Sequence, residues 1–171
     1  VGPHTMAFSR VQGNRLAGSG TAVRRGAGLF LNQGLVQDCR ILTNTMTSTT
    51  STNANGGGVF LFSGALRNCL VAENAAIFNG GGIYAMSNAA TIESLTVAAN
   101  HSVEAATIAG VYLVADAPAQ ITDCIFAHNY NDFDIQDMSV SDSGGTFSYS
   151  CTRPARTGLG NVDDDPGFIN A

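Results

Sequence analysis

Apolar and polar residues alternate in short runs along this chain, and the runs recur in register. The stretch Gly56–Asn74, GGGVFLFSGALRNCLVAEN, opens with three glycines, continues with the apolar run VFLF and ends in an alternating segment. Four other segments align with its second half without gaps, and they end at Asn14, Asn44, Asn100 and Asn129. Short runs rich in β-branched and aromatic residues, bounded by glycine and asparagine, are typical of β-strands rather than helices.

The spacing of these copies predicts the architecture. Successive terminal asparagines lie 30, 30, 26 and 29 residues apart. Periods of about 20 to 50 residues are typical of solenoids, propellers and arrays, and a propeller blade needs about 40 residues. A unit of 24–30 residues with three short strands fits one coil of a parallel β-helix. We therefore expect an all-β, right-handed parallel β-helix of five to six coils, forming a single domain over residues 1–171.

Aligned positions become vertical columns in such a fold, because each residue lies about 4.8 Å above its counterpart in the coil below. Two columns are wholly apolar and predict the core. The first contains Met6, Val36, Leu66, Ile92 and Ile121, and the second contains Val11, Ile41, Val71, Val97 and Phe126. By contrast, the run Thr45–Asn55 is almost entirely Thr, Ser and Asn, and we expect it to be a solvated loop.

A column of asparagines closes the repeat, and we expect it to be a structural ladder. Its members are Asn14, Asn44, Asn74, Asn100 and Asn129. Asparagine tolerates left-handed backbone, so it can turn the chain between two strands. Stacked amides can also pass hydrogen bonds from coil to coil and so satisfy buried polar groups.

Small or sulfur-bearing side chains make up another column, which suits a tight interior corner. It contains Ser9, Cys39, Cys69, Leu95 and Cys124, and we expect Cys151 to continue it. Cys39 and Cys69 fall one coil apart, but parallel neighbours seldom have the side-chain directions that a disulfide needs. Free buried thiols are therefore expected there, and the sequence leaves open whether Cys124 and Cys151 are bridged.

Charge is distributed unevenly along the chain. Residues 1–70 hold six arginines and one acid, whereas residues 71–152 hold nine acids and no base. Sequence order is position along the axis of a solenoid, so its two ends carry opposite charge. No capping helix is visible, and we expect unpaired strand edges at both ends. Head-to-tail contact between copies is then favourable, and such contacts build filaments when they do not close a ring.

Other partners are limited by composition. The net charge of −5 and the lack of a basic stripe interleaved with aromatics disfavour nucleic acid. No apolar run approaches the roughly 20 residues that a membrane-spanning helix requires.

The starts GGGV and GGGI, together with the step Phe126–Asn129 (FAHN), resemble the repeats of polymorphic outer-membrane proteins. More broadly the chain is similar, from about Met6 to Ala171, to bacterial surface proteins with right-handed parallel β-helix repeats, such as autotransporter passengers. The resemblance implies an extracellular or cell-surface protein, and many such proteins have no catalytic role. Because the chain starts at Val1 with no visible signal peptide, we expect a segment or mature part of a longer exported protein.

Candidate chemistry is sparse. Many β-helices cleave polysaccharides, so an enzyme stays open, but residues 68–152 contain no arginine or lysine to serve as a base. The best candidate metal ligands are Asp132, Asp134 and Asp137, whose oxygens suit calcium but lack EF-hand spacing. A solvated acidic loop is the alternative, and no other cofactor is expected.

These observations favour a non-catalytic extracellular β-solenoid with a structural or adhesive role. Its expected partners are further copies of itself, stacked head to tail into filaments, and surface glycans. The alternative is a carbohydrate-binding or polysaccharide-cleaving surface protein of the lyase or hydrolase kind.

Overall fold

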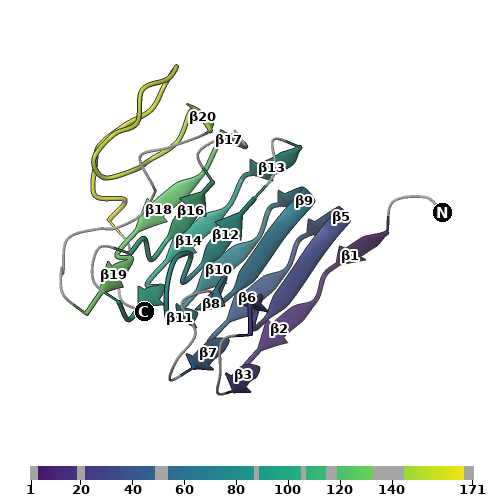
Figure 1. The fold of residues 1–171 in the computed structure, drawn as a ribbon. Coiled ribbons are helices and arrows are strands. Elements are labelled where there is room, and N and C mark those ends of the chain that lie inside the picture. The colour runs from purple at the N-terminus through teal and green to yellow at the C-terminus, as the bar shows by residue number, and fades with distance from the viewer. Residues whose placement is uncertain are drawn as a thin grey trace.

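The computed structural model describes residues 4–18, 22–48, 54–86, 89–104, 107–114, 119–132 and 145–167. In these residues the regular secondary structure is all β-strand, with no helix. The strands pair in parallel with strands of the neighbouring coil, so the protein is an all-β parallel β-solenoid, as predicted (Figure 1). The described ranges contain no helix with the length and hydrophobicity needed to span a membrane.

Three ladders of strands run along the solenoid. The first comprises, in order, β1 (Thr5–Ala7), β5 (Leu29–Gln37), β9 (Val59–Arg67), β13 (Ala90–Glu93), β17 (Gln120–Thr122) and β20 (Thr146–Ser148). The second comprises β2 (Arg10–Gln12), β6 (Arg40–Leu42), β10 (Leu70–Ala72), β14 (Thr96–Ala98) and β18 (Ile125–Ala127). The third comprises β3 (Arg15–Gly18), β7 (Thr45–Ser48), β11 (Ala75–Ala76), β15 (His101–Ser102) and β19 (Tyr130–Asn131).

Four short strands complete the coils. β12 (Ile83–Ala85) pairs with the first half of β9 on one side and with β16 (Val111–Leu113) on the other. β4 (Arg24–Arg25) pairs with β8 (Ala54–Asn55). The second and third ladders have five strands each, which correspond to about four full turns of the solenoid. β20 adds a sixth strand to the first ladder.

The register of the strands follows the columns predicted from the repeat. Val71 lies opposite Ile41 on one side and Val97 on the other, and Leu66 lies between Val36 and Ile92. From the second coil onward, the members of both apolar columns are at most 2% exposed. Met6 and Val11 in the first coil are only partly buried, because no described coil covers their outer side.

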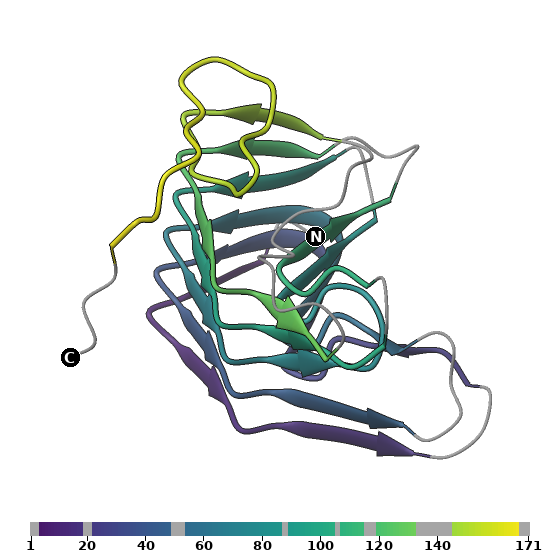
Figure 2. The ribbon, with the colours of Figure 1, turned by 90° about the vertical axis from the view of Figure 1, so that its left-hand side faces the viewer.

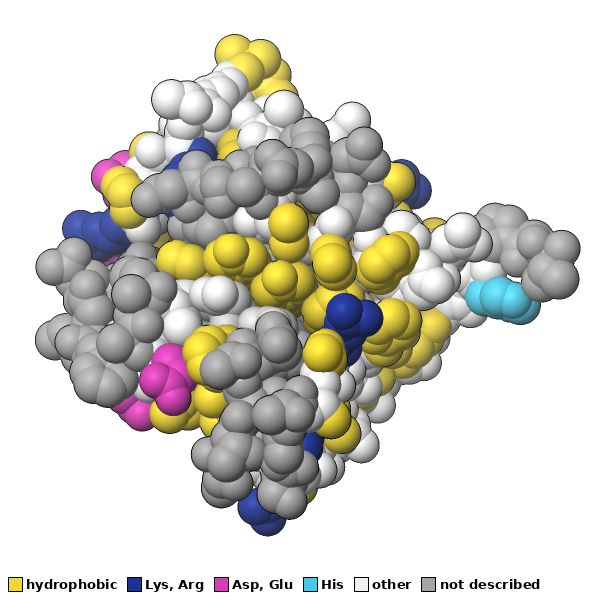
Figure 3. Space-filling model, in the orientation of Figure 1, with side chains coloured by type: hydrophobic (Ala, Val, Ile, Leu, Met, Phe, Trp, Pro, Cys, Tyr) yellow, Lys and Arg dark blue, Asp and Glu magenta, His cyan; other side chains and the backbone are white. Residues whose placement is uncertain are grey.

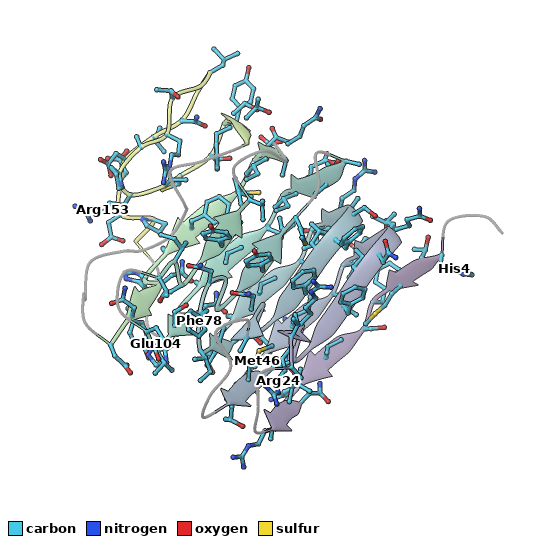
Figure 4. The ribbon with its side chains drawn as sticks, in the orientation of Figure 1. His4, Arg24, Met46, Phe78, Glu104 and Arg153 are labelled. Carbon is cyan, nitrogen blue, oxygen red and sulfur yellow. The ribbon has the colours of Figure 1, made fainter. Side chains whose placement is uncertain are left out.

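Both described parts of the threonine-rich run are strands and not the solvated loop that its composition suggests, while residues 49–53 lie outside the described residues. Thr45–Ser48 is strand β7, paired with β3, and Met46 is buried (labelled in Figure 4). Ala54, at the start of β8, is also buried. Threonine is favoured in strands, and the one apolar side chain of β7, Met46, is buried.

The two ends of the solenoid differ: no described strand lies outside β1, β2 and β3, whereas the terminal segment (residues 145–167) closes part of the edge at the last coil. The expectation of an open edge at both ends is therefore wrong for β17 and Ile125, whereas β19 pairs on one side only in the described residues. The loop of the terminal segment lies at the top of Figure 2. Cys151 bridges Ile125 on one side and Val162 on the other, and the Thr152 amide donates to the Val162 carbonyl. This segment pairs backbone groups that an exposed strand edge would leave without partners.

Candidate functional site

A ladder of buried amides runs through one corner of the coils. Each asparagine Nδ2 donates to the Oδ1 of the next asparagine, at 2.9 Å from Asn14 to Asn44, 2.9 Å from Asn44 to Asn74, 3.0 Å from Asn74 to Asn100 and 2.9 Å from Asn100 to Asn129. The same Oδ1 atoms accept the backbone N–H of the preceding asparagine. All but Asn14 are 0% exposed, and each of these four also donates to a carbonyl of the coil before.

The asparagines do not supply the left-handed turn that their chemistry suggests. Positive φ angles occur at the residue before each asparagine, namely Gly13, Thr43, Glu73, Ala99 and His128, with values between 53° and 66°. The chain therefore turns one residue earlier, and the asparagine side chain enters the interior. Asparagine is needed at these positions for its amide rather than for its backbone.

The glycines before the first strand pack against this ladder. A Cβ atom on Gly58 would lie 2.6 Å from the Gly82 carbonyl oxygen and 2.9 Å from Nδ2 of Asn74. A Cβ atom on Gly28 would likewise lie 2.8 Å from Nδ2 of Asn44. Gly28, Gly58 and Gly82 thus leave room for the amide at the end of their own coil, a contact that sequence spacing alone did not reveal.

Two further asparagines form a smaller amide relay that sequence reasoning missed. Asn55 Oδ1 accepts the backbone N–H of Asn79 at 3.1 Å, and Asn79 Oδ1 accepts that of Ile108 at 2.9 Å. The available signal was their position, since Asn55 and Asn79 each directly precede three glycines.

The cysteine column is a row of hydrogen-bond donors. The Sγ atoms of Cys39, Cys69 and Cys124 donate to the carbonyl oxygen two residues earlier, at 3.0, 3.0 and 3.1 Å. The Oγ atoms of Ser9 and Ser150 make the equivalent bond at 2.9 Å. At this corner, serine and cysteine side chains thus both donate a hydrogen bond to the backbone.

Cys151 does not continue the column as expected. Ser150 does, because its Oγ accepts the Cys124 backbone N–H at 3.1 Å, whereas Cys151 lies opposite Ile125. All four cysteines are free, so Cys124 and Cys151 are not bridged. Burial raises the pKa of Cys69 to about 11 and that of Cys124 to about 12, so both thiols stay protonated at neutral pH.

Aromatic rings form a column on the outside of β5, β9, β12 and β16. Phe30, Phe60, Tyr84 and Tyr112 stack with centroid distances of 5.4, 5.1 and 5.1 Å, and the guanidinium of Arg25 lies 5.0 Å from the Phe60 centroid. Figure 3 shows hydrophobic side chains gathered on this face. The ring faces contact one another, so the column chiefly joins successive coils.

Of the three candidate calcium ligands, only Asp132 lies within the described residues. Its Oδ1 is 2.6 Å from Nε2 of His101, and the His101 ring stacks on Tyr130 at 4.8 Å. Asp134 and Asp137 fall outside the described ranges. Across those ranges, no three His, Cys, Asp or Glu side chains are grouped so that they could hold a metal ion.

A groove of about 790 Å³ lies between the last coil and the terminal segment. Its lining combines aromatic, basic and acidic side chains with two prolines. The residues are Phe126, Ala127, His128, Tyr130, Arg153, Pro154, Asp163, Asp164, Asp165 and Pro166. Figure 4 shows Arg153 on this terminal segment, at the opposite end of the solenoid from His4.

Several contacts hold the walls of the groove. Nε of Arg153 is 3.9 Å from Oδ1 of Asp163, and the Cys151 thiol donates to the Asp164 carbonyl oxygen at 3.1 Å. Oδ1 of Asp165 accepts the backbone N–H of Gly167 at 2.9 Å. The groove is therefore a concave surface whose walls are held by these contacts, and it combines hydrogen-bond donors, acceptors and one exposed aromatic ring.

Comparison of the chain with models of protein families, with curated proteins and with solved structures finds no match. The fold is a parallel β-solenoid of stacked repeats, and the bacterial surface assignment depends on the resemblance of those repeats alone.

Proposed function

We propose that this chain is a non-catalytic β-solenoid of the cell surface or extracellular space, with a structural or adhesive role, whose copies associate head to tail. The observation that carries the proposal is the uncovered first coil. Met6, Val11 and Leu16 point toward the interior but are only partly buried, whereas their counterparts in the second coil are fully buried. A surface of this kind gains stability when another molecule covers it.

The backbone of the first coil supports the same conclusion. β1, β2 and β3 each pair with one strand, and no strand lies on their other side in the described residues. Phe8, at the turn between β1 and β2, is 83% exposed. Unpaired strand edges with adjacent apolar side chains are sites where another chain binds.

The distribution of charge supports the other end of a second copy as the partner. Arg10 and Arg15 are exposed on the first coil, and Asp163, Asp164 and Asp165 are exposed on the terminal segment. Opposite charges steer the two ends together. Because the terminal segment pairs with β17 and with Ile125 of β18, the contact between copies at this part of the last coil uses side chains and not a continuous strand ladder.

An exterior location is supported by the repeats, which resemble those of polymorphic outer-membrane proteins. Proteins with such repeats are typically secreted or anchored at the surface. A stiff rod of stacked coils is suited to carrying a binding surface away from a cell.

Sedimentation velocity and negative-stain electron microscopy across salt concentrations test the association. We expect long assemblies at low ionic strength that dissociate near 1 M salt, where the screening length is about 3 Å. The double variant Arg10→Glu/Arg15→Glu should remain monomeric at low salt. Arg67→Glu reverses a charge in the third coil instead; it loses an exposed ion pair with Glu93, which contributes little to stability, and should assemble like the unmodified chain.

Two results would contradict the proposal. One is a monodisperse short rod at every salt and protein concentration, as expected if earlier residues of a longer chain cover the first coil. The other is assembly that the double charge reversal leaves unchanged.

A further inference from the structure

We propose that the groove beside the terminal segment binds a neutral pyranose unit of a glycan, with Tyr130 as the stacking platform. This inference goes beyond head-to-tail association and does not depend on it. It defines the ligand class of an adhesive surface that the fold alone leaves unspecified.

The size of the groove suits such a ligand. Its volume of about 790 Å³ lies within the range of roughly 300 to 1,000 Å³ that small-molecule sites occupy. One wall is the turn and strand Phe126–Tyr130, and the other is the terminal segment. A ligand between them contacts both walls.

Tyr130 has the exposure and support of a platform. It lies on β19, the last strand of the third ladder, and remains 43% exposed while lining the groove. One face of its ring stacks on His101, whose Nε2 is held 2.6 Å from Oδ1 of Asp132. The ring is thus braced before any ligand arrives, which lowers the entropy cost of binding.

An aromatic platform favours a sugar ring. The face of a tyrosine ring is electron-rich, so it attracts the weakly positive C–H groups on the flat side of a pyranose. The sugar hydroxyls then point outward, toward the polar rim of the groove.

The rim supplies matching hydrogen-bond groups. The guanidinium of Arg153 offers N–H donors, and the carboxylates of Asp163, Asp164 and Asp165 are acceptors. A hydroxyl both donates and accepts, so it can bind both kinds of group. The Arg153–Asp163 distance of 3.9 Å is longer than a direct hydrogen bond and allows a hydroxyl to join them.

The charge of the rim selects against acidic ligands. Three carboxylates face one guanidinium and the imidazole of His128, so the groove is negative at neutral pH. A uronate, a phosphate or a nucleic acid would be repelled, whereas a neutral hexose is not. Neutral glycans are therefore favoured over the uronate-rich polymers on which lyases act.

Saturation-transfer difference NMR provides the test, using maltotriose, cellotriose, tri-N-acetylchitotriose and trigalacturonate as separate probes at about 0.1 M salt, where charges still act over about 10 Å, and at a protein concentration low enough to keep the protein monomeric. We expect saturable binding of at least one neutral trisaccharide and none of trigalacturonate. Tyr130→Ala should weaken that binding roughly tenfold or more, as for aromatic residues that a ligand covers, and Tyr130→Phe should retain it.

A matched control is Tyr149→Ala, because Tyr149 is 57% exposed on the same end of the molecule but does not line the groove. It should leave binding unchanged. Arg153→Gln, at a side chain that is 63% exposed, should weaken binding without affecting the circular dichroism spectrum, which provides a second test if Tyr130→Ala does not fold.

Three results would overturn the proposal. They are no binding of any neutral probe, preferential binding of trigalacturonate, and binding that both Tyr130→Ala and Arg153→Gln leave intact. Since all of these measurements use the monomer, they are independent of whether copies assemble end to end.

Discussion

At the scale of single residues, the interior is unusual in stacking the same polar group in every coil. Oδ1 of Asn74 accepts hydrogen bonds from both the side-chain Nδ2 and the backbone N–H of Asn44. Nδ2 of Asn74 donates to Oδ1 of Asn100 and to the Ile41 carbonyl oxygen. A buried polar group without a partner costs about 1 to 3 kcal/mol. The ladder is therefore stable only as a complete set.

Replacing one member in the middle should show this. We expect Asn74→Leu to lower the free energy of unfolding by ~3 kcal/mol or more, because it leaves donors of Asn44 unpaired in a dry interior. Asn14→Ala, at the exposed end of the ladder, should cost about 1 kcal/mol. Urea denaturation measures both, and equal losses would show that the buried amides are not coupled.

The corner thiols predict a dependence on alkaline pH. Their ordinary pKa is 9.0, and burial raises it to about 11 for Cys69 and about 12 for Cys124. Above pH 9 the unfolded chain releases these protons while the folded chain retains them, so the unfolded state gains stability. The contribution of the thiols is complete below pH 9 and is lost as pH rises through 11 and 12.

The double variant Cys69→Ser/Cys124→Ser should remove this dependence and keep the corner hydrogen bonds, as Ser9 and Ser150 do. Melting temperatures from pH 7 to pH 11 provide the measurement, since the tyrosines are the same in both proteins. An identical alkaline decline in the two proteins would contradict the assignment.

At the scale of elements, the start and the end of each coil depend on one another. Gly58 leads into β9 and lies against Asn74, which follows β10. A side chain on Gly58 would collide with the backbone of the next coil, where nothing can move aside without breaking strand pairs. The repeat therefore conserves a spatial contact between two positions that are distant within one coil.

Gly58→Ala should lower the free energy of unfolding by about 3 kcal/mol, at the upper end of the range for overpacking. Gly13→Ala is the control, because a Cβ there meets nothing within 4 Å. Alanine already occupies the equivalent left-handed position at residue 99, so this change should cost about 1 kcal/mol. Comparable losses at the two sites would indicate that backbone strain, and not the contact with the ladder, explains the glycine column.

Repetition is what made the elements predictable. Val71 could be matched to Ile41 and Val97 because similar residues recur in each coil at nearly the same spacing. Where a coil lacks that pattern, prediction failed: the run at Thr45 has no apolar alternation, and Cys151 follows a region in which the repeat is lost. The groove could not be predicted either, because its two walls, Phe126–Tyr130 and Arg153–Pro166, are far apart in sequence and share no motif.

At the scale of the whole molecule, stability comes mainly from contacts between coils rather than within them. The strands of each coil pair with strands of the neighbouring coils, so the solenoid unfolds when one interface is lost in the middle. In the described residues the first coil is covered on one side only, and the terminal segment covers part of the last. The ends are thus the sites where partners and ligands bind.

Val71→Asp tests the packing of the central coils. Val71 is 0% exposed, and an unpaired charge there should abolish folding. Ser94→Asp, at an exposed corner where Asp38 and Asp123 occupy the equivalent positions, should fold normally. Circular dichroism melts distinguish the two variants, and a normal melt for Val71→Asp would show that this residue is not in the core.

The central claim is that residues one coil apart are direct neighbours in space. Nuclear Overhauser effects between backbone protons of Ile41 and Val71, and of Val71 and Val97, test it most directly. We expect cross-peaks for both pairs, since their strands pair in parallel in that register. Strong cross-peaks from Val71 to residues of a different register, with none to Ile41 or Val97, would contradict the stacked solenoid.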